Sequence, residues 1–180
     1  CKKRNDYIIS LIPNLIAQNR TILILTERIA QVDYIYDKVK ELEMTTIGKY
    51  IGKLRQDVLD ESLKCRIIIG TYNMIEEGFD CKTLDTLIMA TPKVTIEQSV
   101  GRILRKQKEE RTIKPLVIDI YDLFANNLNK GKKRLTFYKK QKYRIKTYNV
   151  NDDQIPTCIV EIKNDKTKSS KTNQKTTYRF

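Results

Sequence analysis

The chain has 180 residues, 40% of them hydrophobic, and carries a formal net charge of +13 at pH 7 with no histidine and four cysteines. This length suits one domain with an appendage, and no apolar run approaches the ~18 residues of a membrane span, so we expect no membrane partner. The lack of histidine excludes Ser-His-Asp and Cys-His catalysis, and cysteines without a CxxC pair predict no metal site and an intracellular, reducing compartment.

In the first half of the chain, strand and helix patterns alternate. The run TILILT at 21–26 is short, apolar and rich in β-branched residues, which is typical of a strand buried on both faces. We expect further strands over 45–51 and 65–70, and helices over 5–20, 28–42 and 54–63.

The second half continues this alternation, with strands expected over 84–90, 116–120 and 142–148 and helices over 95–106 and 122–140. Such an order predicts an α/β fold, a mainly parallel sheet flanked by helices. We expect this domain to cover residues 1–150. A short extension over 151–162, with a strand as one option, and a disordered basic tail over 163–180 would follow.

Basic side chains concentrate near the C-terminus. Nine Lys or Arg and no acidic residue lie within 130–146, whereas residues 1–129 carry a net charge of only +2. This asymmetry favours a polyanionic partner, most often nucleic acid, over a solvated lysine-rich surface. Arg134, Phe137, Tyr138 and Tyr143 belong to this segment. Its aromatic rings either stack on bases while the cations hold phosphates or, as we favour for Tyr138 and Tyr143, face the core.

The segment GKYIGKL at 48–54 superficially resembles a phosphate-binding loop. Its first glycine is one residue too close to the second, and Leu54 lacks the hydroxyl that holds Mg²⁺. No acidic box follows a buried strand elsewhere. We therefore expect the chain to lack the phosphate cradle and the Mg²⁺ carboxylate that hydrolysis of ATP requires.

The segment QSVGRILR at 98–105 puts Arg102 and Arg105 on one face of an expected helix. A guanidinium inserted from a neighbouring domain neutralises the charge that develops on a γ-phosphate during phosphoryl transfer. Gly101 would let a neighbouring surface approach closely. The alternative is a surface helix with exposed arginines.

A second polar group surrounds the segments GTY at 70–72 and EEGFD at 76–80. Thr71 follows a buried strand, and ligands of open α/β sheets bind beyond the carboxyl ends of strands. Gly78 permits a turn that would direct Asp80 toward that crevice, where its carboxylate could accept a ribose hydroxyl. The alternative is an ordinary turn with an aspartate cap.

These segments together resemble a known family over roughly residues 20–148. TILILTERIAQVDYI is similar to motif IV, TYNMIEEGFD to motif V and QSVGRILR to motif VI of superfamily 2 helicases. The chain is thus identified as a C-terminal RecA-like lobe of that superfamily. It is closest to the phage and large-DNA-virus branch (poxvirus-like, asfarvirus-like) that is related to the excision-repair helicases.

The resemblance implies roles for individual residues. The catalytic arginines that reach ATP across the cleft between lobes would be Arg102 and Arg105. Residues near the nucleotide would be Gln98, Glu77, Gly78 and Asp80. Residues that contact nucleic acid would be Thr26, Arg28, Lys53, Thr71 and Tyr72. Surface roles are equally open for Arg28 and Lys53.

The resemblance also implies the function of the whole protein. The chain would be the second motor lobe of an ATP-dependent helicase, and a P-loop lobe of the same protein would hold most of the ATP and Mg²⁺. Ser99 replaces an arginine typical of DEAD-box RNA helicases, which favours single-stranded or forked DNA over RNA. A viral role in transcription, in host cytoplasm or virion, would fit. The alternative is a non-catalytic nucleic-acid-binding module on the same scaffold.

Overall fold

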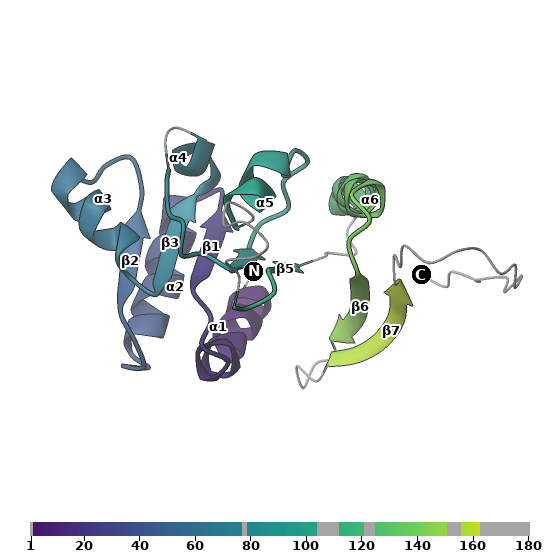
Figure 1. The fold of residues 1–180 in the computed structure, drawn as a ribbon, viewed down its shortest axis with the longest axis horizontal. Coiled ribbons are helices and arrows are strands. Elements are labelled where there is room, and N and C mark those ends of the chain that lie inside the picture. Colours follow the sequence, from purple (N-terminus) through teal and green to yellow (C-terminus); the bar gives the residue numbers. More distant parts are fainter. Residues whose placement is uncertain (1, 77–78, 104–111, 121–124, 151–155, 163–180) are drawn as a thin grey trace, which may run out of the picture. The chain divides into compact units, whose positions relative to one another are not determined.

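The computed structural model describes residues 2–76, 79–103, 112–120, 125–150 and 156–162. The chain divides into two compact units, Cys1–Arg134 and Leu135–Phe180. The first unit contains a five-stranded sheet with its flanking helices, and the second contains a two-stranded sheet (Figure 1). The predicted domain limits at residues 150 and 162 stay predictions.

The five-stranded sheet is entirely parallel and follows the order β2-β3-β1-β4-β5. Its strands are β1 (Ile22–Thr26), β2 (Ile47–Tyr50), β3 (Ile67–Thr71), β4 (Thr86–Met89) and β5 (Leu116–Asp119). Every residue of β1 is buried, as its central place requires. The predicted α/β class with a mainly parallel sheet is confirmed.

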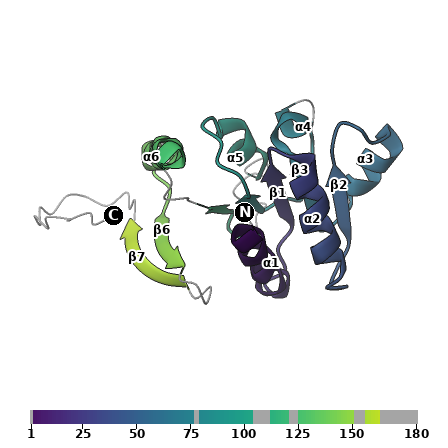
Figure 2. The ribbon, with the colours of Figure 1, turned by 180° about the vertical axis from the view of Figure 1, so that it is seen from behind.

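Helices cover both faces of this sheet (Figures 1 and 2). The helices of the first unit are α1 (Lys2–Ala17), α2 (Ile29–Lys40), α3 (Gln56–Leu63), α4 (Tyr72–Glu76) and α5 (Glu97–Ile103), and α6 (Ala125–Lys140) runs into the second unit. Buried side chains of α1 and α2 form one core with Ile22, Ile24 and Ile67. Because side chains alternate along a strand, Leu23 and Ile68 face the opposite side, where α3 and α5 lie.

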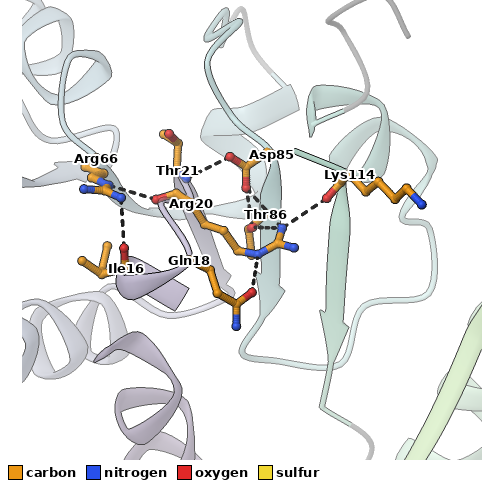
Figure 3. Close-up of polar contacts among 8 residues, drawn as sticks. All are labelled: Ile16, Gln18, Arg20, Thr21, Arg66, Asp85, Thr86 and Lys114. Carbon is orange, nitrogen blue, oxygen red and sulfur yellow. Dashed lines mark hydrogen bonds and ion pairs between the residues drawn. The ribbon is translucent and has the colours of Figure 1, made fainter. Parts of the chain in front are cut away.

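Two arginines fasten the amino edge of the sheet (Figure 3). One Nη of Arg20 donates to the carboxylate of Asp85 (3.4 Å) and to the carbonyl of Lys114 (3.2 Å), which joins the residues preceding β1, β4 and β5. Arg66 donates to the carbonyls of Arg20 (3.1 Å) and Ile16 (3.1 Å), which joins the start of β3 to α1. These side-chain donors thus join chain segments at the amino ends of the strands that are distant in sequence.

The structure differs from the predicted elements in two places. The short helix α4 was not expected, because five residues are too few to show a helical period. The strand expected over 142–148 does not join the parallel sheet. It is β6 (Ile145–Val150), which pairs antiparallel with β7 (Pro156–Ile162).

The second unit combines the end of α6 with the β6–β7 hairpin. Tyr138 is 9% exposed, and the centroid of its ring lies 5.8 Å from that of Phe137 and 6.4 Å from that of Tyr143. The preferred core-facing interpretation therefore holds for Tyr138. In the described part of the chain, no helix is long and apolar enough to cross a membrane.

Close contact between β2 and β3 leads to a stability prediction. Gly70 is in register with Tyr50, and a Cβ at Gly70 would lie 2.6 Å from the Tyr50 carbonyl oxygen. We expect Gly70→Ala to lower the free energy of unfolding by about 1–3 kcal/mol because the strand backbones must separate. Urea denaturation measures it. Gly101→Ala is the control, since no described atom lies within 4 Å of its Cβ; equal stability of the two variants would contradict the prediction.

Candidate nucleic-acid and nucleotide interface

Polar residues gather at the carboxyl edge of the five-stranded sheet. Parallel strands all end at one edge, and the register pairs the last residue of β1, Thr26, with the last of β3, Thr71. Likewise Met89 of β4 is in register with Asp119, the last residue of β5. The segments that leave these strands therefore meet at one edge, where ligands of open α/β sheets bind.

Thr26 lies below this edge rather than on its surface. Its side chain is buried, and its hydroxyl donates to the Arg28 carbonyl (2.9 Å) and accepts the Arg28 N–H (3.2 Å). Arg28 has an extended backbone and precedes the first turn of α2, with its side chain exposed. In this structure the Thr26 hydroxyl closes the turn, and Arg28 is the side chain that solvent reaches. Phosphate contacts by either residue stay predictions.

Thr71 and Tyr72 line a recess of about 270 Å³ together with Glu27, Asn73 and Lys93; we call it the Lys93 recess. The Tyr72 hydroxyl donates to the Thr91 carbonyl (2.8 Å), and burial raises the pKa of Tyr72. The ring is thus a fixed wall, and its nucleic-acid contact stays a prediction. Thr71 is half-buried at the end of its strand.

Lys93 was not singled out from the sequence, although it lies in this recess. Its ammonium lies 4.9 Å from the centre of the Tyr72 ring and forms an ion pair with Glu76. The signal that could have found it is position, since Thr91, Pro92 and Lys93 follow the carboxyl end of β4 as Thr71 and Tyr72 mark that of β3.

A buried ion pair between Arg134 and Asp119 holds the backbone of Lys93 in the recess. Arg134 is 1% exposed, and its guanidinium donates two bonds to the Asp119 carboxylate (2.7 and 2.8 Å) and one to the Lys93 carbonyl (3.0 Å). The suggestion that Arg134 belongs to a basic surface for nucleic acid is wrong, because its charge is neutralised inside the fold. Such two-pronged geometry suits the planar guanidinium.

Arg102 joins the two segments that resemble motifs V and VI. From α5 it donates to the carbonyls of Ile75 and Phe79, each at 2.7 Å. Phe79 is buried and meets the Tyr50 ring edge-on, with centroids 4.9 Å apart. The guanidinium therefore joins Ile75 of α4 and Phe79 to α5. A catalytic role of Arg102 stays a prediction, and Arg105, Glu77 and Gly78 lie outside the described residues.

Three further predicted site residues, within the described part of the chain, have exposed side chains. Asp80 directly follows Phe79, while Gln98 lies in the first turn of α5; both have exposed side chains. Lys53 is exposed in the turn between β2 and α3. Asp80 thus adjoins the residue whose carbonyl accepts a hydrogen bond from Arg102. It does not test the roles assigned to these residues.

Several viral proteins are similar in sequence to the chain. The Acanthamoeba polyphaga mimivirus protein "Putative ATP-dependent RNA helicase L396" is 40% identical over 84% of this chain and 29% of its own length. "Putative helicase 161L" of Invertebrate iridescent virus 6 is 29% identical over 82% of this chain and 36% of its own length. The chain thus spans about a third of these relatives. No protein-family model matches it.

Solved structures share the fold. The match to the crystal structure of T4 UvsW covers 79% of this chain and 33% of the UvsW chain, with a TM-score of 0.60 and 21% sequence identity. The match to the C-terminal domain of the DEAD-box protein Dbp5 covers 78% of this chain and 81% of the Dbp5 domain, with a TM-score of 0.60 and 15% sequence identity. The predicted RecA-like lobe is confirmed as a fold.

The Arg102 contacts predict a stability effect that charge alone does not explain. Lysine keeps the charge but lacks the fork that reaches two carbonyls, so we expect Arg102→Lys to lower the free energy of unfolding by about 1 kcal/mol. Urea denaturation measures it. In the control, Arg55→Lys, the arginine is exposed in an ion pair with Asp57. An equally small change in both variants would show that the two bonds contribute nothing.

The buried pair predicts a larger effect. Asp119→Asn removes the counter-charge of a guanidinium that solvent does not reach, so we expect a loss of about 3 kcal/mol in the free energy of unfolding. Asp33→Asn is the matched control, because Asp33 pairs with Lys49 while 46% exposed. Thermal and urea denaturation of both variants check the prediction, which fails if Asp119→Asn is no more destabilised than Asp33→Asn.

Proposed function

We propose that the chain is the second motor lobe of an ATP-dependent nucleic-acid helicase or translocase. The proposal proceeds from its C-terminal RecA-like fold and from its similarity to viral proteins that are named as helicases. One observation carries the proposal. The segment similar to motif V and the helix similar to motif VI are held together by Arg102 at the edge of the sheet where ligands bind.

The nucleotide would lie between this lobe and a P-loop lobe of the same protein. The sequence offers no phosphate cradle of its own, so the other lobe would hold the ATP phosphates and Mg²⁺, and this chain alone would not hydrolyse ATP. From this side, exposed Asp80 and Gln98 would face the nucleotide. Arg102 and Arg105 would stabilise the charge on the γ-phosphate when the lobes close.

Nucleic acid would lie along the strand ends of β1 and β3. Thr71 and Tyr72 line the recess at the end of β3. Arg28, which is exposed, follows Thr26 at the end of β1. Because Arg102 links Ile75 and Phe79 to α5, movement of either segment on ATP binding would be passed to the other. Closure and release would then step the lobe along one strand.

We favour DNA over RNA as the nucleic acid along which the motor moves. Ser99, 1% exposed, occupies the place of the arginine expected in DEAD-box RNA helicases, which suits the DNA-translocating branches. The name of the mimivirus relative, by contrast, specifies RNA. Unwinding of a duplex or displacement of a transcript would be the outcome of translocation.

The decisive experiment measures ATP turnover by the complete protein. Loss of an arginine that neutralises the γ-phosphate costs about 10³-fold or more, so we expect Arg105→Ala to abolish most turnover and to leave nucleic-acid affinity unchanged. Arg55→Ala, an exposed arginine in an ion pair with Asp57, is the control. Turnover is measured without nucleic acid, with single-stranded DNA and with RNA of the same sequence.

The outcomes separate the candidate functions. Greater stimulation by DNA than by RNA supports the DNA assignment, and the reverse transfers the proposal to RNA. If Arg105→Ala keeps its turnover but binds nucleic acid more weakly, the motor assignment is wrong. The chain is then a non-catalytic nucleic-acid-binding module.

A further inference from the structure

The Lys93 recess contains a cation whose present partner is easily replaced. The Lys93 ammonium lies over the Tyr72 ring and pairs with Glu76, the last residue of α4. The side chains of Lys93 and Glu76 are 20% and 39% exposed. The Glu76 side of the pair is open to solvent, which screens the interaction, so an incoming anion can reach the ammonium and exchange with the carboxylate.

The backbone of Lys93, by contrast, is fixed. Its carbonyl accepts a bond from Arg134, which the Asp119 carboxylate holds in place. Pro92 precedes it and is buried, and the proline ring restricts the chain entering Lys93. The base of the side chain is therefore held at the recess, and only the four-carbon stem with its ammonium is free to change partner.

The surroundings suit a phosphate oxygen better than a second protein charge. Thr71 offers a hydroxyl and Asn73 an amide in the same recess, both able to donate hydrogen bonds. Glu27 also lines the recess and Glu76 adjoins it, so without a ligand the local charge is not positive. Lys93 then presents a positive charge only when Glu76 is displaced.

We propose that Lys93 binds a backbone phosphate of the nucleic-acid strand. When no strand is bound, the Glu76 carboxylate takes the place of that phosphate and pairs with the Lys93 ammonium. The inference rests on the proposed function and adds a binding residue, with its internal competitor, to that surface. A carboxylate is a monoanion that mimics one phosphate. Its displacement makes strand binding depend on the Lys93–Glu76 pair without any change of fold.

The test compares charge-removing variants at both positions in the complete protein. Binding of fluorescein-labelled oligothymidylate and oligouridylate is followed by anisotropy, without ATP, between about 50 and 200 mM salt. We expect Lys93→Gln to weaken binding about fivefold or more, and to lower the slope of log affinity against log salt by about 0.7, as loss of one single-strand phosphate contact should. Lys93→Arg should keep the slope.

The Glu76 variants test the competitor. Glu76→Gln should bind about twofold or more tightly than wild type, since displacement no longer opposes binding. In the Lys93→Gln background the same substitution should have no effect. A gain that persists in that background would overturn the competitor role, because it would reflect only the removal of one negative charge.

A second ion pair supplies matched controls. Lys64 and Glu61 form an exposed pair near the amino end of β3, at the opposite edge of the sheet. Lys64→Gln and Glu61→Gln make the same charge changes, and we expect little effect on affinity or salt slope from either. Thermal melting verifies that all variants are folded.

Two failures are distinguishable. If the wild-type protein binds neither oligonucleotide, the proposed function falls and the role of Lys93 falls with it. If the wild type binds and Lys93→Gln behaves like Lys64→Gln, only the role of Lys93 is overturned. The ion pair with Glu76 would then serve to fasten α4.

Discussion

All five strands of the main sheet run in one direction, and the remainder of the first unit depends on that constraint. A parallel sheet collects every segment that leaves a carboxyl strand end at one edge, whatever the distance between those segments in sequence. Thr26, Thr71 and Lys93 are brought together in this way, although the chain between them builds helices on both faces of the sheet. The opposite edge collects the amino ends and carries a different set of contacts.

Arginines fasten both edges, by the same chemistry. Arg20 and Arg66 donate to carbonyls at the amino edge, and Arg102 and Arg134 do so at the carboxyl edge. A guanidinium has five donors in a rigid plane, so one side chain can satisfy carbonyls of segments that no ladder joins. The two edges differ in consequence. At the amino edge the bonds join strand starts, whereas Arg102 and Arg134 hold the segments proposed to meet ligands.

The net charge of +13 therefore has two components. Arg134 is buried against Asp119 and contributes nothing to an outer field, and Arg20 is largely enclosed with Asp85. Exposed cations such as Arg28 and Lys53 remain available to a polyanion. Within the Lys93 recess, charge is conditional on Glu76, which distinguishes this surface from a permanently basic patch.

The sequence by itself determined the fold class, the presence of β1, β3, β4 and β5 as short apolar strands, and the family resemblance, because apolar periodicity and motif spacing are local properties of a chain. It also singled out Arg102, Asp80 and Thr71, whose roles stay predictions. Only the tertiary structure decided what those side chains touch: that Thr26 turns its hydroxyl to Arg28, that Arg102 holds Ile75 and Phe79, and that Arg134 is internal. The sequence also did not predict the pairing of β6 with β7 or the position of Lys93 in the recess. The physical reason is that burial, ion pairing and register join residues tens of positions apart, and no local pattern specifies them.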